Sequence, residues 1–145
     1  MLLVGIYSCD EEDSPSFNFE DQIAQGSIDG DDWTFATGTA KDLGGGQEGV
    51  SIELSNVSIS DPCDEFIFPS QIRFALFSTS IGVFPISDDT SGFANFIGIG
   101  FVEGAIEIES INNTTVSGRV DVRFTDPDTN VISFINGDFM VPFCN

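Results

Sequence analysis

The chain has 145 residues, of which 24 are Asp or Glu and only four are Lys or Arg, so its formal net charge is −20. Such a surface repels phosphate backbones and anionic lipid headgroups, which excludes nucleic acid as an expected partner. The chain has no histidine, the residue used most often for acid–base catalysis and for zinc or copper binding. Hydrophobic residues make up 41% of the chain, including 15 Phe, which is enough for the core of one domain.

The N-terminus combines an apolar run at residues 2–7 with Cys9 and four acidic residues at 10–13. The apolar run is too short to span a bilayer, which takes about 20 residues, but it has the length of the end of a signal peptide. Ile6, Tyr7, Ser8 and Cys9 resemble a bacterial lipoprotein signal box, and the acidic run resembles the export signal of surface lipoproteins in the Bacteroidota.

This resemblance implies a signal-peptide remnant at residues 1–8 and an acylated Cys9 that inserts into the outer membrane. Residues 9–21 would then be the lipidated cysteine and an acidic tether, and the protein would be exposed on the cell surface. The alternative is a buried N-terminal strand in which Cys9 is a core thiol or half of a disulfide.

From residue 22 onward, apolar and polar residues alternate with a period of two, which is typical of β strands. Gly, Asn, Asp and Pro separate the segments. We expect strands at 22–28, 33–40, 50–57, 71–78, 81–86, 91–102, 104–111, 115–124 and 131–141. Pro85 indicates an edge strand, residues 91–102 and 104–111 are predicted to form a hairpin, and Gly137 is predicted to form a bulge.

Eight or nine short strands predict an all-β domain at residues 22–145, an antiparallel barrel or sandwich. Its opening, residues 26–33, and its closing, residues 135–145, resemble lipocalin-like (calycin-type) domains of Bacteroidota lipoproteins. That resemblance implies a lipocalin-like fold, and it assigns no ligand residues.

Two further cysteines, Cys63 and Cys144, remain once Cys9 is assigned to the anchor. Each lies close to a proline, at a strand end or in a loop, and an exported protein resides where disulfides persist. We therefore predict a Cys63–Cys144 disulfide. The alternative is two separate buried thiols.

Acidic turns are candidate calcium sites, because calcium binds six to eight oxygen atoms. Asp126, Asp128 and Asn130 have the best spacing, although the loop lacks the Gly and the distal Glu of an EF-hand. The acidic turns at residues 29–32 and 61–65 are two further candidate calcium sites. The alternative for all three is ordinary turn chemistry, since Asp and Asn favour turns.

Strand carboxylates could also form the acid pair of a glycosidase. The candidates are Glu53, Glu103, Glu107 and Glu109, but alternating glutamates are equally typical of a solvated strand face. Because histidine is absent and Tyr7 is the only tyrosine, we expect that the protein is not an enzyme.

An apolar pocket is the remaining candidate site, since a barrel of about eight strands can enclose one small ligand. Its expected lining is Trp33, Phe35, Phe74, Phe96 and Phe101. The alternative is a core filled by the phenylalanines. The sequence thus predicts a surface lipoprotein whose domain binds a small apolar ligand or a surface glycan or protein, or a structural, adhesive or carbohydrate-binding module with a filled core. Exposed Phe or Trp on a sandwich face would indicate carbohydrate binding.

Overall fold

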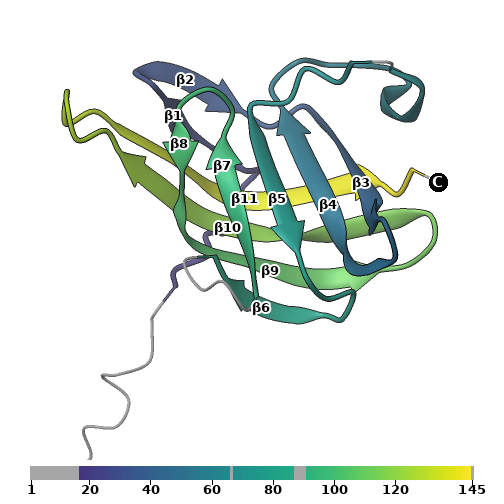
Figure 1. The fold of residues 1–145 in the computed structure, drawn as a ribbon. Coiled ribbons are helices and arrows are strands. Elements are labelled where there is room, and N and C mark those ends of the chain that lie inside the picture. Colours follow the sequence, from purple (N-terminus) through teal and green to yellow (C-terminus); the bar gives the residue numbers. More distant parts are fainter. Residues whose placement is uncertain (1–16, 66, 87–90, 145) are drawn as a thin grey trace, which may run out of the picture.

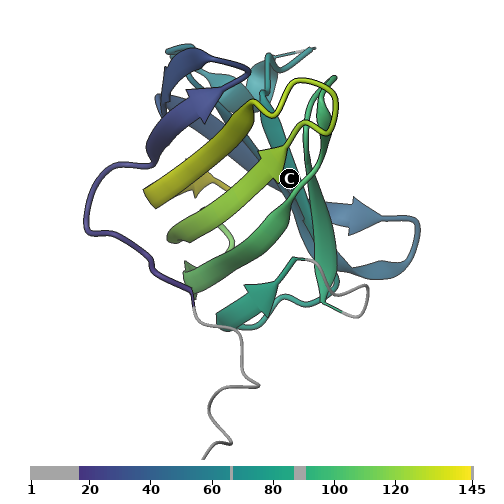
Figure 2. The same ribbon diagram turned by 90° about the vertical axis from the view of Figure 1, so that its left-hand side faces the viewer.

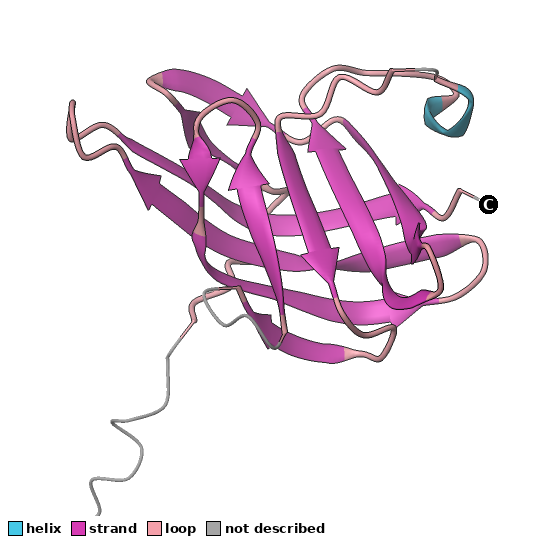
Figure 3. Cartoon of the chain, viewed as in Figure 1, coloured by secondary structure: helices cyan, strands magenta, loops and turns pink. Residues whose placement is uncertain are grey.

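A computed structural model describes residues 17–65, 67–86 and 91–144. In these residues, all regular structure is β strand except for one short 3-10 helix, η2 (Pro62–Asp64) (Figure 3). The strands are β1 (Gln25–Ile28), β2 (Asp31–Thr34), β3 (Thr37–Gly44), β4 (Gln47–Ser55), β5 (Ile72–Leu76), β6 (Gly82–Pro85), β7 (Gly92–Phe96), β8 (Gly100–Phe101), β9 (Glu103–Ile111), β10 (Thr115–Thr125) and β11 (Ile132–Pro142). The described residues contain no helix long and apolar enough to cross a membrane.

The strands form two antiparallel sheets that pack face to face (Figure 1). Sheet A has the order β2-β1-β11-β10-β9-β6, and sheet B has the order β3-β4-β5-β7-β8. Figure 1 shows the strands of sheet B in front, running across those of sheet A. The all-β prediction is confirmed, and of its two forms the structure is a sandwich and not a closed barrel.

Period-two alternation places one side of every long strand in the interior between the sheets. The inward side chains include Ile52, Phe74 and Phe96 from sheet B and Ile106 and Ile135 from sheet A, each with 0% exposure. A side chain with no exposed area borders no space that a water molecule could enter. The interior around these residues is therefore filled at close packing.

The predicted strand at 33–40 is wrong, because the chain changes sheets within it. The Phe35 N–H donates to the Ala24 carbonyl on the sheet A side, whereas the next amide, that of Ala36, donates to Ser55 of β4 in sheet B. Residues 31–34 become β2 and residues 37–44 become β3. Alternation continues through such a corner, so the pattern alone does not reveal it.

The predicted hairpin of 91–102 with 104–111 is also wrong. After β7 the chain turns at Gly98, whose φ of 79° favours glycine, and the short β8 then pairs with β7. The chain then crosses to sheet A at Val102, whose side chain is buried, and β9 pairs with β10 and β6 instead. The edge position predicted from Pro85 is confirmed, since β6 lies at the edge of sheet A.

Gly137 does not form the predicted bulge, because β10 and β11 keep one continuous register from Thr115 to Thr125. The register shift lies instead between β9 and β10, at Ser117/Gly118. Gly137 serves a close approach: a Cβ there would lie 2.6 Å from the Gln22 carbonyl oxygen, and its φ is +133°. Glycine is thus needed where the N-terminal segment crosses β11.

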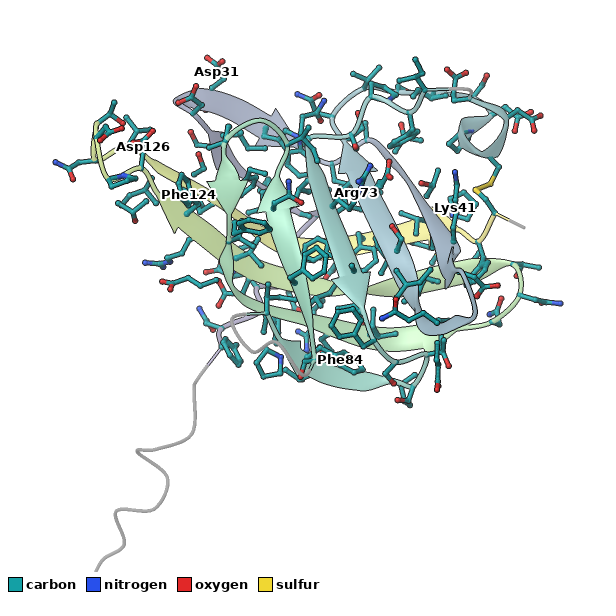
Figure 4. All side chains as sticks on the ribbon, viewed as in Figure 1. Asp31, Lys41, Arg73, Phe84, Phe124 and Asp126 are labelled. Carbon is teal, nitrogen blue, oxygen red and sulfur yellow. A yellow bond between two sulfur atoms is a disulfide. The ribbon has the colours of Figure 1, made fainter. Side chains whose placement is uncertain are left out.

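The predicted Cys63–Cys144 disulfide is present and joins residues 81 positions apart (Figure 4). Cys63 lies in η2, in the loop between β4 and β5, and Cys144 follows β11. The Cys144 N–H also donates to the Ala40 carbonyl of β3, at 2.7 Å. The disulfide therefore fastens a long loop of sheet B to the end of sheet A along the β3 edge.

Candidate functional site

The five residues predicted to line a pocket do not surround a common space. Trp33, Phe74 and Phe96 lie in the packed interior, with exposures of 3% or less. Phe35 is half-buried at the corner between the sheets, and Phe101 is 71% exposed on β8. The burial of Trp33, Phe74 and Phe96 indicates that the core around Phe74 and Phe96 is filled.

A groove lies on sheet A next to the β9/β10 register shift. It has a volume of about 520 Å³, and its walls include Ile23, Phe35, Phe139 and Met140. Of the five predicted pocket residues, Phe35 alone contributes to this groove. The carboxylate-bearing residues Glu109 and Asp138 also line it.

Three phenylalanines line up on the outer face of sheet B, and we call Phe77, Phe93 and Phe101 the aromatic row. The ring centroids of Phe77 and Phe93 are 6.0 Å apart, and those of Phe93 and Phe101 are 6.3 Å apart, both in edge-to-face geometry. Phe93 is 44% exposed. Because Phe74 and Phe96 face inward on β5 and β7, odd-numbered residues of these strands face outward.

A row of hydrogen-bonding side chains lies beside the aromatic row on the same face. Glu53, Arg73 and Asn95 occupy directly paired positions on β4, β5 and β7, and Asn95 is paired in turn with Phe101 of β8. We call these three residues the polar row. Arg73 donates through Nε and Nη2 to Glu53 Oε2, at 3.1 and 3.0 Å. Figure 4 shows Arg73 on this face of the sandwich.

A hollow of about 370 Å³ lies beyond β8, where the edge of sheet B approaches β10. Its lining comprises Phe101, Val102, Glu103, Arg123, Phe124 and Thr125. Gly100 makes room for the ring of Phe124, since a Cβ there would lie 2.7 Å from Phe124 Cζ. Figure 4 labels Phe124 on this side of the molecule. Phe101 belongs to both the hollow and the aromatic row.

The four candidate catalytic glutamates are divided between the two sheets. Glu53 lies on sheet B, paired with Arg73, and the others lie on β9. Glu107 Oε1 is 2.7 Å from Arg119 Nη2, and Glu109 is 3.8 Å from the same guanidinium. The hydrogen bond to Glu107 raises the pKa of Arg119, and the nearby carboxylates add to this effect. Glu103 lines the hollow beyond β8.

The Asp126 loop makes ordinary turn interactions. Asp126 Oδ1 accepts the N–H groups of Asp128 and Thr129, at 2.8 and 3.3 Å, and Asn130 adopts a φ of 63°. Within the described residues, no group of three or more Asp, Glu, Cys or His side chains is placed to hold a metal ion. In the second acidic turn, the hydrogen bond with Asp64 and the repulsion of that carboxylate raise the pKa of Asp61.

Comparison of the chain with family models, with curated protein sequences and with solved structures gives no match. The predicted lipidation residue, Cys9, lies outside the described residues. Sequence reasoning predicted the strand at 71–78 but missed the aromatic row. The signal was available in the alternation of β5, where burial of Phe74 and Leu76 turns Phe77 outward with Arg73.

Proposed function

We propose that this protein is a surface-anchored carbohydrate-binding module that binds glycans on the outer face of sheet B. The observation that carries the proposal is the exposed aromatic row next to the polar row. A sugar ring has an apolar C–H face and a rim of hydroxyl groups. The aromatic rings would pack against the C–H face, and Arg73, Glu53 and Asn95 would exchange hydrogen bonds with the hydroxyls.

The rest of the molecule favours this ligand class over others. The net charge of −20 disfavours nucleic acids and anionic lipid surfaces. Because the interior around Phe74 and Phe96 is closely packed, these residues cannot contact a ligand between the sheets. An outer face that combines apolar rings with a few directed polar groups has the composition of a recognition site.

The proposal includes the lipid anchor predicted from the sequence. Two or three acyl chains on Cys9 would hold the domain at the outer membrane, because each buried methylene contributes about 0.8 kcal/mol. The proposal takes only this lipoprotein setting from the lipocalin-like resemblance. It takes no ligand site from it, because the resemblance assigns no ligand residues. Mass spectrometry of the N-terminal peptide from the native host tests the anchor: a diacylated or triacylated Cys9 supports it, and an intact unmodified leader contradicts it.

The glycan site is tested by electrophoresis of the purified full chain through gels containing xylan, β-glucan or mannan. The wild type should be retarded by at least one of these polysaccharides. Phe93→Ala and Phe101→Ala should each weaken binding about tenfold, since an aromatic contact contributes up to about 1.4 kcal/mol. Phe134→Ala is the matched control, because Phe134 is 43% exposed but lies on β11 in sheet A.

A wild-type protein that no glycan retards would contradict the proposal. Equal weakening by Phe134→Ala and Phe93→Ala would also contradict it, because the effect would then not belong to sheet B.

The groove on sheet A supports a second candidate function, the binding of a small apolar ligand. Its volume of about 520 Å³ lies in the range of small-molecule sites, and Phe35, Phe139 and Met140 provide apolar walls. An uncharged apolar fluorescent probe, N-phenyl-1-naphthylamine, tests this function. Met140→Asp should abolish probe binding, and an unchanged signal in that variant would exclude the groove.

A further inference from the structure

We infer that the hollow beyond β8 is a second sugar subsite, continuous with the aromatic row, and that the glycan it takes is neutral. This inference rests on the proposed glycan-binding function and adds to it the direction, the length and the charge class of the ligand. The glycan would run across β5, β7 and β8 and continue around the sheet edge towards β10.

Phe101 makes the two sites continuous. Its ring is 6.3 Å from that of Phe93 on one side, and it lines the hollow on the other. With 71% of its area exposed, Phe101 can contact a ligand on both sides. A glycan that packs on Phe93 and Phe101 is therefore directed into the hollow by the same ring. The volume of about 370 Å³ is at the low end for ligand sites, so the hollow suits one small unit.

The lining of the hollow repeats the chemistry of the sheet face. Phe101 and Phe124 supply aromatic surface, and Arg123 and Glu103, which are directly paired between β10 and β9, supply a donor and an acceptor. Arg123 forms no ion pair with any described residue, so its guanidinium can donate to sugar hydroxyls. The hydroxyl of Thr125 adds a further polar group.

The charge of the surroundings selects a neutral ligand. Glu103 lies opposite Arg123 in the hollow, and Glu53 already pairs with Arg73 on the sheet face. A glycan with a carboxylate on every unit would approach a protein with net charge −20. Repulsion of this kind acts over roughly 8 Å at physiological ionic strength and opposes an anionic chain.

Isothermal titration calorimetry with gluco-, xylo- and manno-oligosaccharides of two and six units tests the inference on the full chain. Six-unit chains should bind more tightly than two-unit chains of the same sugar. Arg123→Gln should weaken binding of the six-unit chain about tenfold, because a hydrogen bond to a charged group is lost. Lys41→Gln removes the same charge from β3, away from the hollow, and should change the affinity little.

Several outcomes would overturn the inference. If Phe93→Ala weakens binding but Arg123→Gln binds six-unit chains like the wild type, the hollow is not a subsite, although the proposed function stands. Equal losses in Arg123→Gln and Lys41→Gln would mean a general charge effect. Tighter binding of hexagalacturonate than of the neutral six-unit chains would refute the neutral class. If no oligosaccharide binds, both the subsite and the proposed function fail.

Discussion

The outer faces of the two sheets differ in what covers them. On sheet A, residues 17–22, which we call the strap, run across β10 and β11 (Figure 2). The Asn136 side chain of β11 holds the strap twice: its Oδ1 accepts the Glu20 N–H at 2.8 Å, and its Nδ2 donates to the Asn18 carbonyl at 2.7 Å. Asp121 accepts the Asn18 N–H at 3.0 Å. The outer face of sheet A is thus partly occupied by the chain itself.

Arg119 adds a charged contact to the strap. Its guanidinium lies 5.4 Å from the centroid of the Phe19 ring, pairs with Glu107 and lies 3.8 Å from Asp21. On sheet B, by contrast, the described residues place no such segment over the aromatic row, and Phe101 is 71% exposed. Two faces with the same alternating pattern therefore differ: the N-terminal segment covers part of one, and the aromatic row of the other is exposed.

The largest effect that we predict is the loss of stability when the disulfide that joins the two sheets is removed. In Cys63→Ser/Cys144→Ser, the free energy of unfolding should fall by about 4.5 kcal/mol, because the bridge closes a long loop in the unfolded chain. Thermal unfolding with and without reducing agent measures this. Reduction should lower the melting temperature of the wild type and leave that of the variant unchanged.

The same experiment tests whether the two faces belong to one folding unit. A single transition, seen both by circular dichroism and by near-ultraviolet absorbance, would keep them in one unit. An unchanged melting temperature on reduction would contradict the stabilising role of the bridge.

The next effect separates binding from stability on sheet B. Phe93→Ala should weaken glycan binding about tenfold, equivalent to about 1.4 kcal/mol. It should lower the free energy of unfolding by less than about 1 kcal/mol, because the ring is already partly exposed. Urea unfolding beside calorimetry distinguishes the two. A larger loss of stability than of affinity would mean that the aromatic row is part of the core and not a site.

The reverse pattern is expected on sheet A. Asn136→Ala removes two hydrogen bonds to the strap and should lower the free energy of unfolding by about 1 kcal/mol. Amide exchange at Asn18 and Glu20 should accelerate, while glycan binding should remain at the wild-type level. A loss of glycan binding in this variant would show that the two faces are coupled, and the contrast between them would fail.

The sequence predicted strand content well but not the assignment of strands to sheets. Alternation located β10 and β11 almost to the residue, because both are long and each has one buried side. It could not reveal the corners at Phe35 and Val102, since a chain that changes sheets keeps its inward side inward. The disulfide was predictable, because Cys63 and Cys144 are the two cysteines that remain once Cys9 is assigned to the expected anchor, and both lie near loops.

The candidate site was harder to predict for a related reason. Trp33 and Phe101 both look like core residues from their side chains alone. Their exposures, 3% and 71%, depend on strand pairing, and β8 is an edge strand of two residues that lies outside any long alternating pattern. Residues 17–21, assigned to the tether by composition, contact sheet A through hydrogen bonds that are invisible in the sequence.

The smallest predicted effect is a salt dependence that the two faces should not share. Raising NaCl from about 0.1 to about 1 M shortens the screening length from roughly 10 to 3 Å and weakens exposed ion pairs. Amide exchange in the strap should therefore accelerate with salt, because Arg119 holds Asp21 and Phe19 partly through charge. Affinity for a neutral glycan on sheet B should stay nearly constant, since aromatic packing involves no net charge.

Arg119→Gln separates this local effect from the stability of the whole domain. In that variant the salt dependence of strap exchange should disappear, whereas the melting temperature of both proteins should rise with salt as the repulsion within a chain of net charge −20 is screened. Strap exchange that slows with salt in the wild type would show that self-repulsion, and not Arg119, controls the strap. The strap would then be a passive extension of the tether, and the difference between the two faces would rest on the hydrogen bonds of Asn136 alone.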